Sequence, residues 1–321
     1  MVMHQNMPGV LDEARRYCDF LEKENCLEGL ELHLKNGVFR NLQDRSKMAV
    51  LRESLIRDVE MRRPMSLVRL GDGEGNILFY GGRFRQYPQL SELTADMVWK
   101  LMFGRFKGGF ENWSKMYSGI KEAISGATYL GVHTYEQVSG AFKNLRSADS
   151  RPIDIRGSVG VVAVWDWLWS QKENIGNEVT YVTCHVHKDI LSFYTEIIRA
   201  AGNISLITCY EELLPKIQAQ AGVVSDKDAT YLIPGQAANI KKTPEKLHFP
   251  DRFNEIACDI DGEDLKGRLF FVGAGLAGKL YCEKIRRAGG MAIDVGSLMD
   301  VWMGLGVRPY QSKEFVDKNK L

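Results

Sequence analysis

The chain has 321 residues, of which 45% are hydrophobic and 26% are charged, and its formal net charge is +1. This size and composition are typical of a globular protein with one large domain or two smaller ones. The near-zero net charge argues against a dedicated nucleic-acid-binding protein, and no apolar run is long enough to span a bilayer. The six cysteines contain no CxxC pair, which predicts buried free thiols instead of disulfides or a zinc site.

The N-terminal region is predicted to be helical. Apolar residues recur at helical spacing in Val10–Glu22 and in Lys47–Arg62, on either side of a break at Asn41–Asp44. We therefore expect residues 1–62 to form an N-terminal helical extension that either covers the main domain or binds partners. The first residues lack the basic segment followed by an apolar core that is typical of a secretory signal. We therefore expect a cytoplasmic location.

A run of glycines and acids follows the first strand-like segment. Ser66–Leu70 is a short apolar run, which predicts a buried strand, and Gly71–Gly75 then reads Gly-Asp-Gly-Glu-Gly. We expect a tight turn whose glycines direct Asp72 and Glu74 toward one point. Two carboxylates suit Mg²⁺ or Mn²⁺ together with substrate phosphates, and Arg69 is a candidate to bind phosphate or to pair with one acid. The alternative is a solvated turn without a ligand.

From residue 63 onward, strand-like runs alternate with helix-like segments. The further strand-like runs are Tyr129–Val132, Glu178–Cys184, Ile204–Thr208, Thr230–Pro234, Arg268–Val272 and Met291–Asp294. This alternation predicts an α/β domain over residues 63–321 with a mostly parallel, doubly wound, Rossmann-like sheet. Ligands of such sheets bind beyond the carboxyl ends of the strands, so the polar segments that follow these runs are expected along one edge.

Three other features allow more than one interpretation. Gly81–Gly126 is rich in arginine, lysine and aromatic residues, and it fits either a lid or acceptor-binding insertion or two surface helices. The tryptophans of Trp165–Trp169 could stack on a sugar or a base, but core packing is favoured. His185 and His187 lie two residues apart after a strand-like run and could be metal ligands, although an isolated histidine pair is more often structural.

A glycine-rich segment follows one of the last strand-like runs. Gly273, Gly275 and Gly278 have the GxGxxG spacing, and Asp294 ends the next strand-like run. The number of residues between these glycines and Asp294 is close to that between the glycines and the acidic residue of a dinucleotide-binding fingerprint. The backbone amides of this segment, with Lys279 beside them, predict an anion site. Because only about one strand–helix unit follows, a nucleoside diphosphate is expected to fit better than a dinucleotide.

One N-terminal segment and one C-terminal segment, the latter in two parts, resemble a known family. Ser66–Glu74, together with Phe271–Lys279 and Gly290–Trp302, is similar to the GT-D-fold glycosyltransferases, in which an R-x-G-D-G-E turn carries a D-x-E metal motif. The two segments bracket residues 66–302, and the region between them matches by strand pattern alone. The resemblance implies metal-dependent transfer of a sugar from a nucleotide-sugar donor, typically a UDP-sugar, to a glycan or glycoprotein acceptor in bacterial surface-glycan or glycoprotein assembly.

The resemblance also implies roles for residues. Asp72 and Glu74 correspond to the D-x-E pair, so an Mn²⁺ or Mg²⁺ ion held there would neutralise the leaving diphosphate, and Arg69 and the glycine-rich amides would donate hydrogen bonds to it. The remaining candidates for nucleotide-sugar binding are Gly71, Gly73, Gly273, Gly275, Gly278, Lys279 and Asp294. The candidates for a general base in an inverting transfer are Asp300, Asp166, His133 and His185.

Two other functions are compatible with the sequence. The first is an NAD-type oxidoreductase that uses the C-terminal fingerprint. The second is a non-catalytic nucleotide-sugar-binding protein whose N-terminal helices bind partners. The residues alone specify neither the sugar nor the acceptor, and an oligomer is compatible with them.

Overall fold

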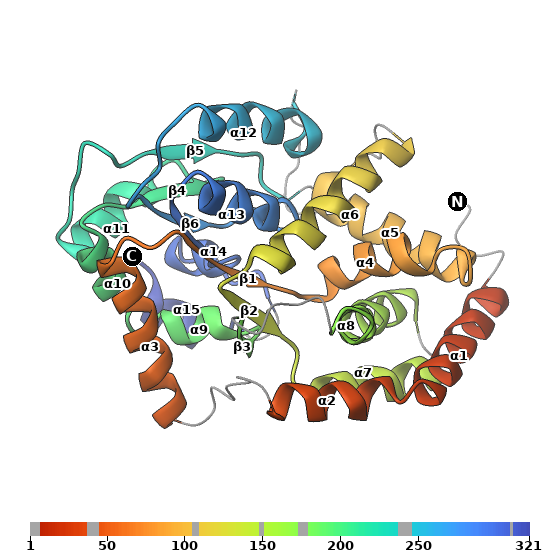
Figure 1. Cartoon of the computed structure of the whole chain (residues 1–321). Coiled ribbons are helices and arrows are strands. Elements are labelled where there is room, and N and C mark those ends of the chain that lie inside the picture. The colour runs from red at the N-terminus through yellow and green to blue at the C-terminus, as the bar shows by residue number, and fades with distance from the viewer. Residues whose placement is uncertain are drawn as a thin grey trace. The chain divides into compact units, whose positions relative to one another are not determined.

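A computed structural model of the chain describes residues 7–36, 45–104, 109–147, 151–172, 179–236, 246–308 and 311–321. Within these residues, seven parallel strands form one sheet that is flanked by helices, in the order β3-β2-β1-β7-β6-β4-β5 (Figure 1). The strands are β1 (Met65–Arg69), β2 (Tyr129–Val132), β3 (Thr180–Thr183), β4 (Ser205–Thr208), β5 (Thr230–Leu232), β6 (Leu269–Val272) and β7 (Met291–Asp294). The predicted α/β fold with a parallel, Rossmann-like sheet is confirmed.

The contacts between residues divide the chain into two compact units. The first unit comprises Met1–Arg40, Arg69–Lys121 and Leu130–Cys184, and the second comprises Asn41–Val68, Glu122–Tyr129 and His185–Leu321. The N-terminal helices therefore do not form a group of their own: α1 and α2 belong to the first unit and α3 to the second. The domain boundary expected after residue 62 stays a prediction.

The first unit is built around one apolar helix, α8. Helices α2, α4, α5 and α7 all pack against it, and in Figure 1 α2 and α7 lie below α8 while α4 lies above it. The helices of this unit are α1 (Met7–Lys23), α2 (Cys26–Asn36), α4 (Asp72–Arg83), α5 (Pro88–Phe103), α6 (Gly109–Gly126), α7 (Tyr135–Arg146) and α8 (Pro152–Ser170), of which α6 ends in the second unit. The predicted helix at Val10–Glu22 is thus confirmed, and α5 and α6 lie within Gly81–Gly126, where a lid or acceptor-binding role stays open.

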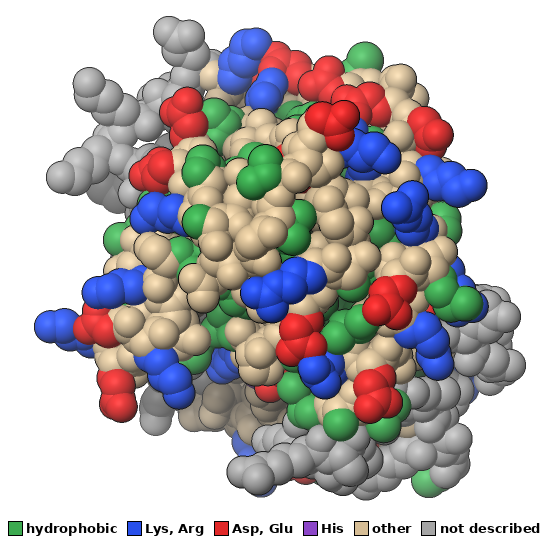
Figure 2. Space-filling view, turned by 90° about the vertical axis from the view of Figure 1, so that its left-hand side faces the viewer, with side chains coloured by type: hydrophobic (Ala, Val, Ile, Leu, Met, Phe, Trp, Pro, Cys, Tyr) green, Lys and Arg blue, Asp and Glu red, His purple; other side chains and the backbone are tan. Residues whose placement is uncertain are grey.

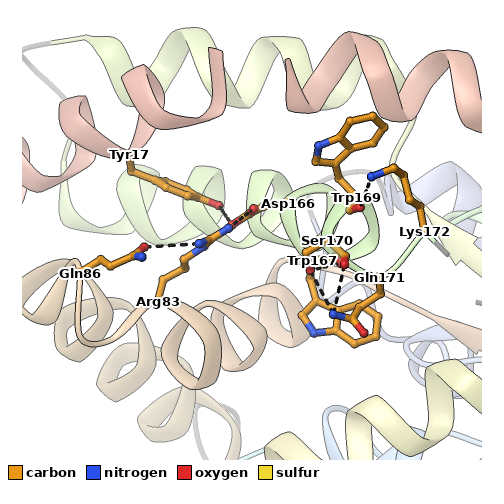
Figure 3. Close-up of polar contacts among 9 residues, drawn as sticks. All are labelled: Tyr17, Arg83, Gln86, Asp166, Trp167, Trp169, Ser170, Gln171 and Lys172. Carbon is orange, nitrogen blue, oxygen red and sulfur yellow. Dashed lines mark hydrogen bonds and ion pairs between the residues drawn. The ribbon is translucent and has the colours of Figure 1, made fainter. Parts of the chain in front are cut away.

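A buried ion pair joins three helices of the first unit (Figure 3). Both oxygens of Asp166 on α8 accept hydrogen bonds from Arg83 on α4, at 2.9 Å from Nε and 2.6 Å from Nη2. The hydroxyl of Tyr17 on α1 donates a third bond to Asp166, at 3.0 Å. Burial, reinforced by this carboxylate, raises the pKa of Tyr17. The expectation that Asp166 lies at a strand end was wrong, because it lies within α8, and its two oxygens accept hydrogen bonds from Arg83 and Tyr17.

The tryptophan-rich segment of α8 lies mainly in the core. Trp165 and Trp167 are buried, as the sequence favoured. The indole N–H of Trp165 donates to the carbonyl oxygen of His133 at 3.0 Å. Since a buried Trp N–H needs a partner, this bond also fixes the backbone just after β2.

In the second unit, helices cover both faces of the sheet. On one face of β6, Phe271 stacks on Trp302 of α14, with ring centroids 6.0 Å apart. On the other face, Gly278 of α13 packs against Val272, since a Cβ at Gly278 would lie 3.5 Å from a methyl carbon of that valine. The helices of this unit are α3 (Arg45–Glu60), α9 (Val186–Ile190), α10 (Tyr194–Ala201), α11 (Leu213–Ala221), η2 (His248–Arg252), α12 (Phe253–Asp261), α13 (Ala277–Arg287), α14 (Leu298–Trp302) and α15 (Lys313–Asn319).

The surface and the cysteines complete the description. On the described part of the face in Figure 2, basic and acidic side chains are interspersed and hydrophobic side chains are scattered among them. None of the described helices combines the length and the apolar character needed to cross a membrane.

All six cysteines are free thiols, but Cys209 and Cys258 are exposed, so the expectation of burial was wrong for these two.

Candidate functional site

The two predicted metal ligands lie in the first turn of a helix. Helix α4 begins at Asp72, directly after β1, so the expectation of a turn through Gly71–Gly75 was wrong. Glu74 explains why a helix forms here despite three glycines. Its Oε2 accepts a hydrogen bond from the N–H of Gly71, the N-cap residue, at 2.8 Å, which satisfies a backbone donor as in a capping box. Negative charge in this turn also interacts favourably with the helix dipole.

Two glycines allow this turn to approach α8 closely. A Cβ at Gly75 would overlap the carbonyl oxygen of Gly160, and a Cβ at Gly160 would overlap the carbonyl oxygen of Asp72. The buried amide of Asn76 joins the same two helices, because its Nδ2 donates to the carbonyl oxygens of Asp72 at 2.7 Å and of Arg156 at 2.9 Å. The position of Asp72 is therefore fixed by backbone contacts with α8.

This close approach predicts opposite effects for two glycine-to-alanine substitutions in α8. Gly160→Ala is expected to lower the free energy of unfolding by about 1–3 kcal/mol, because the added methyl group must push α4 away. Gly157→Ala adds the same methyl group where no atom lies within 4 Å, and it is expected to raise that free energy by about 0.5–1 kcal/mol, since alanine favours a helix interior. Urea denaturation of both variants tests this, and equal effects of the two substitutions would contradict the described helix contact.

The charged side chains around Asp72 come from three different segments. Asp72 forms a salt bridge with Arg156 of α8, with 2.8 Å between Oδ2 and Nη1. Arg69, at the end of β1, donates from Nη1 to the carbonyl oxygen of Cys184, just beyond β3, at 3.0 Å. Arg69 thus binds a backbone oxygen here, whereas the sequence suggested phosphate or an acid as its partner.

A buried histidine lies near both acids. His133 follows β2, and its Nδ1 is 3.3 Å from the Sγ of Cys184 and 3.3 Å from the Oε1 of Gln137. Burial lowers the pKa of His133, while the negative charges of Asp72 and Glu74 act in the opposite direction. Burial thus disfavours the charged imidazolium, and the two carboxylates favour it.

The acids near His133 fit a hard divalent ion. Residues two apart on a helix do not normally face one another, but Glu74 folds back toward the N-cap, and Asp72 is the first residue of the helix. Carboxylate oxygens are the ligands that Mg²⁺ and Mn²⁺ prefer.

Among the residues around Asp72, the sequence identified Asp72, Glu74 and Arg69 as candidates but did not identify Arg156 and Asn76. The spacing of four residues between Asp72 and Asn76 is a helical signal, whereas nothing in the sequence links Arg156 to Asp72.

The glycine-rich segment of the second unit forms a tight turn between β6 and α13. Gly275 has φ = +54°, a backbone conformation that favours glycine. Lys279, which the sequence predicted to add a cation to an anion site, instead directs its ammonium group to the Oδ2 of Asp294 at 2.9 Å and to the carbonyl oxygen of Gly275 at 3.2 Å. Both side chains of this ion pair are at most 5% exposed. Asp294, which the sequence offered as a candidate for nucleotide-sugar binding, is thus paired inside the protein.

The other predicted acid–base groups differ in their surroundings. Asp300 on α14 accepts a hydrogen bond from the hydroxyl of Tyr210 at 2.6 Å, and burial raises the pKa of Asp300, as is common for acid–base residues. His185 precedes α9, and its ring centroid is 6.1 Å from that of the buried His187. Asp300 lies on α14, not at a strand end as the sequence suggested, and its role as a base stays a prediction.

The predicted site residues are divided between the two units. Asp72, Glu74 and Arg69 lie in the first unit, with Gly71 and Gly73 at the start of α4, and the glycine-rich turn, Lys279 and Asp294 lie in the second. No family model, curated protein or solved structure matches this chain.

Proposed function

We propose that the chain is a metal-dependent glycosyltransferase, which moves a sugar from a nucleotide-sugar donor, such as a UDP-sugar, to a hydroxyl group of a glycan or glycoprotein in the cytoplasm. One observation carries the proposal: Asp72 and Glu74 lie in the first turn of the helix that directly follows a buried strand of a parallel sheet. Parallel sheets bind ligands beyond the carboxyl ends of their strands. An Mn²⁺ or Mg²⁺ ion held by these two acids would supply a Lewis acid for the leaving diphosphate.

The chain's own residues would perform the remaining tasks. The amides of the glycine-rich turn after β6 are the candidates for binding the nucleotide diphosphate. Asp300, with its raised pKa, is the candidate to accept the proton of the acceptor hydroxyl in an inverting transfer.

A second candidate function is an NAD-type oxidoreductase. The positive φ of Gly275 in a turn between a strand and a helix supports it. The pairing of Asp294 with Lys279 speaks against it, because that carboxylate would have to leave a buried ion pair to bind a ribose. We therefore favour the transferase. A non-catalytic nucleotide-sugar-binding protein would bind the same donors as the transferase but would not release nucleoside diphosphate from them.

A panel of nucleotide sugars incubated with the protein and Mn²⁺ tests the proposal. Release of nucleoside diphosphate from one donor, lost on addition of EDTA, is the expected result. In a parallel thermal-shift assay, UDP with Mn²⁺ is expected to raise the melting temperature, since a ligand at one hundred times its Kd stabilises a protein by about 2.7 kcal/mol. Stabilisation by NAD(H) alone would favour the oxidoreductase. Stabilisation by nucleotide sugars without release, with or without acceptors, would indicate a binding protein.

A further inference from the structure

The salt bridge between Arg156 and Asp72 is the feature of the first unit that the sequence did not predict. Nη1 of Arg156 lies 2.8 Å from Oδ2 of Asp72, and the arginine side chain is only 14% exposed, against 42% for the aspartate. The buried partner is thus the cation, and the more accessible partner is the proposed metal ligand. A divalent ion that binds Asp72 would meet a guanidinium group already in place.

Packing fixes the point from which the Arg156 side chain extends. Its carbonyl oxygen accepts the hydrogen bond from Asn76 of α4, and one turn later Gly160 packs against the backbone of Asp72. These contacts join α4 to α8 through the backbone and through Asn76. The salt bridge is therefore not required to hold the two helices together.

Arg156 has an unused hydrogen-bond donor. Its Nε is buried, and no described residue accepts a hydrogen bond from it. A buried polar group without a partner costs free energy, so its presence beside a proposed ligand site indicates that something else accepts this bond. A guanidinium group presents its donors as a planar fork that matches the oxygens of a phosphate.

We propose that Arg156 and the divalent ion compete for the carboxylate of Asp72, and that the displaced guanidinium group binds a phosphate of the nucleotide donor. This inference rests on the proposed metal-dependent transfer. Two cations on one carboxylate repel each other. Binding of the metal ion therefore favours the conformation in which Arg156 no longer contacts Asp72. A diphosphate then supplies the negative charge and the acceptor oxygens that the arginine has lost. Arg156 in this way couples metal binding to donor binding.

The test is Arg156→Gln, with two affinities measured separately. Binding of Mn²⁺ alone, followed by electron paramagnetic resonance of the free ion, is expected to become about tenfold tighter, because the competing cation is gone. Binding of UDP at saturating Mn²⁺, followed by isothermal titration calorimetry, is expected to become at least about tenfold weaker, because a charged hydrogen bond to phosphate is lost. The two affinities change in opposite directions.

Arg151→Gln is the matched control. Arg151 precedes α8, is 75% exposed and pairs with Asp154 at 2.7 Å, so this variant loses the same charge from the same part of the chain. Both of its affinities are expected to equal those of the wild type. A general effect of net charge would change this control as well, and it would overturn the inference.

Other outcomes also overturn the inference. If Arg156→Gln weakens both affinities, the arginine only supports the fold, and if it changes neither, Arg156 has no role in binding. In both cases, release of diphosphate by the wild type with Mn²⁺ would leave the proposed function standing. If the wild-type protein binds neither Mn²⁺ nor UDP and releases no diphosphate, the proposed function fails, and the inference fails with it.

Discussion

Replacing Asp72 by asparagine is expected to reduce metal-dependent release of nucleoside diphosphate by at least about 100-fold. Stabilisation of a leaving phosphate by a metal ion is worth several kcal/mol, and each 1.4 kcal/mol or so corresponds to a factor of ten in rate. Asparagine keeps the size of the side chain and removes its charge, so the contacts of the backbone with α8 are retained. The measurement is the initial rate of diphosphate release as a function of Mn²⁺ concentration.

The control for this prediction is Asp154→Asn. Asp154 lies on α8, is 42% exposed like Asp72 and also pairs with an arginine, so it matches Asp72 in everything except its place in the site. Its substitution is expected to leave the rate unchanged. Glu74→Gln is less informative, because Glu74 also caps α4 and loss of a cap costs about 0.5–2 kcal/mol. Wild-type activity of Asp72→Asn would rule out the proposed metal site.

The second large effect concerns stability. Asp166→Ala is expected to lower the free energy of unfolding of the first unit by about 3–5 kcal/mol, because it leaves the charge of Arg83 without its partner in a mostly buried position. Tyr17 also loses the acceptor of its hydroxyl. Five of the six tryptophans, all except Trp302, belong to the first unit. Urea denaturation followed by tryptophan fluorescence therefore reports mainly on this unit.

Two further variants distinguish the effect of breaking the buried ion pair from the effect of removing any charge. Asp12→Ala removes an acid that pairs with Arg16 on the exposed side of α1, and it is expected to change the stability by less than about 1 kcal/mol. Replacing both Arg83 and Asp166 with apolar residues of similar size is expected to recover most of the loss, because no buried charge then remains unpaired. A loss below 1 kcal/mol for Asp166→Ala would mean that water reaches the pair.

The sheet could be predicted from the sequence because its strands are buried on both faces. Leu269–Val272 is continuously apolar and Ile204–Thr208 is mostly apolar, and both end at polar or glycine-rich segments, which is the signal that parallel strands give. The start of α4 was not predictable in this way. Three glycines in five residues favour a turn by their local preference, but the cap supplied by Glu74 and the contact of Gly75 with Gly160 favour a helix.

The candidate site could be predicted only in part, because side-chain partners depend on the fold. Asp72 and Glu74 were found by their position after a strand. Arg156 could not be found, since its partner lies far away in the sequence. Asp294 was selected by its spacing from the glycines, but spacing does not tell whether a carboxylate points to a ligand or to a buried lysine such as Lys279.

The division of the chain has a consequence for its biosynthesis. The first unit needs no segment beyond Cys184, whereas the second contains β1, which pairs with β7 from the opposite end of the chain, as in the register Met65 to Met291. During synthesis β1 can therefore pair with β2, its other neighbour in the sheet, but its opposite edge has no partner until β7 has been made. Contacts between such distant segments form slowly, so this edge of β1 is the part of the nascent second unit that we expect a chaperone to protect.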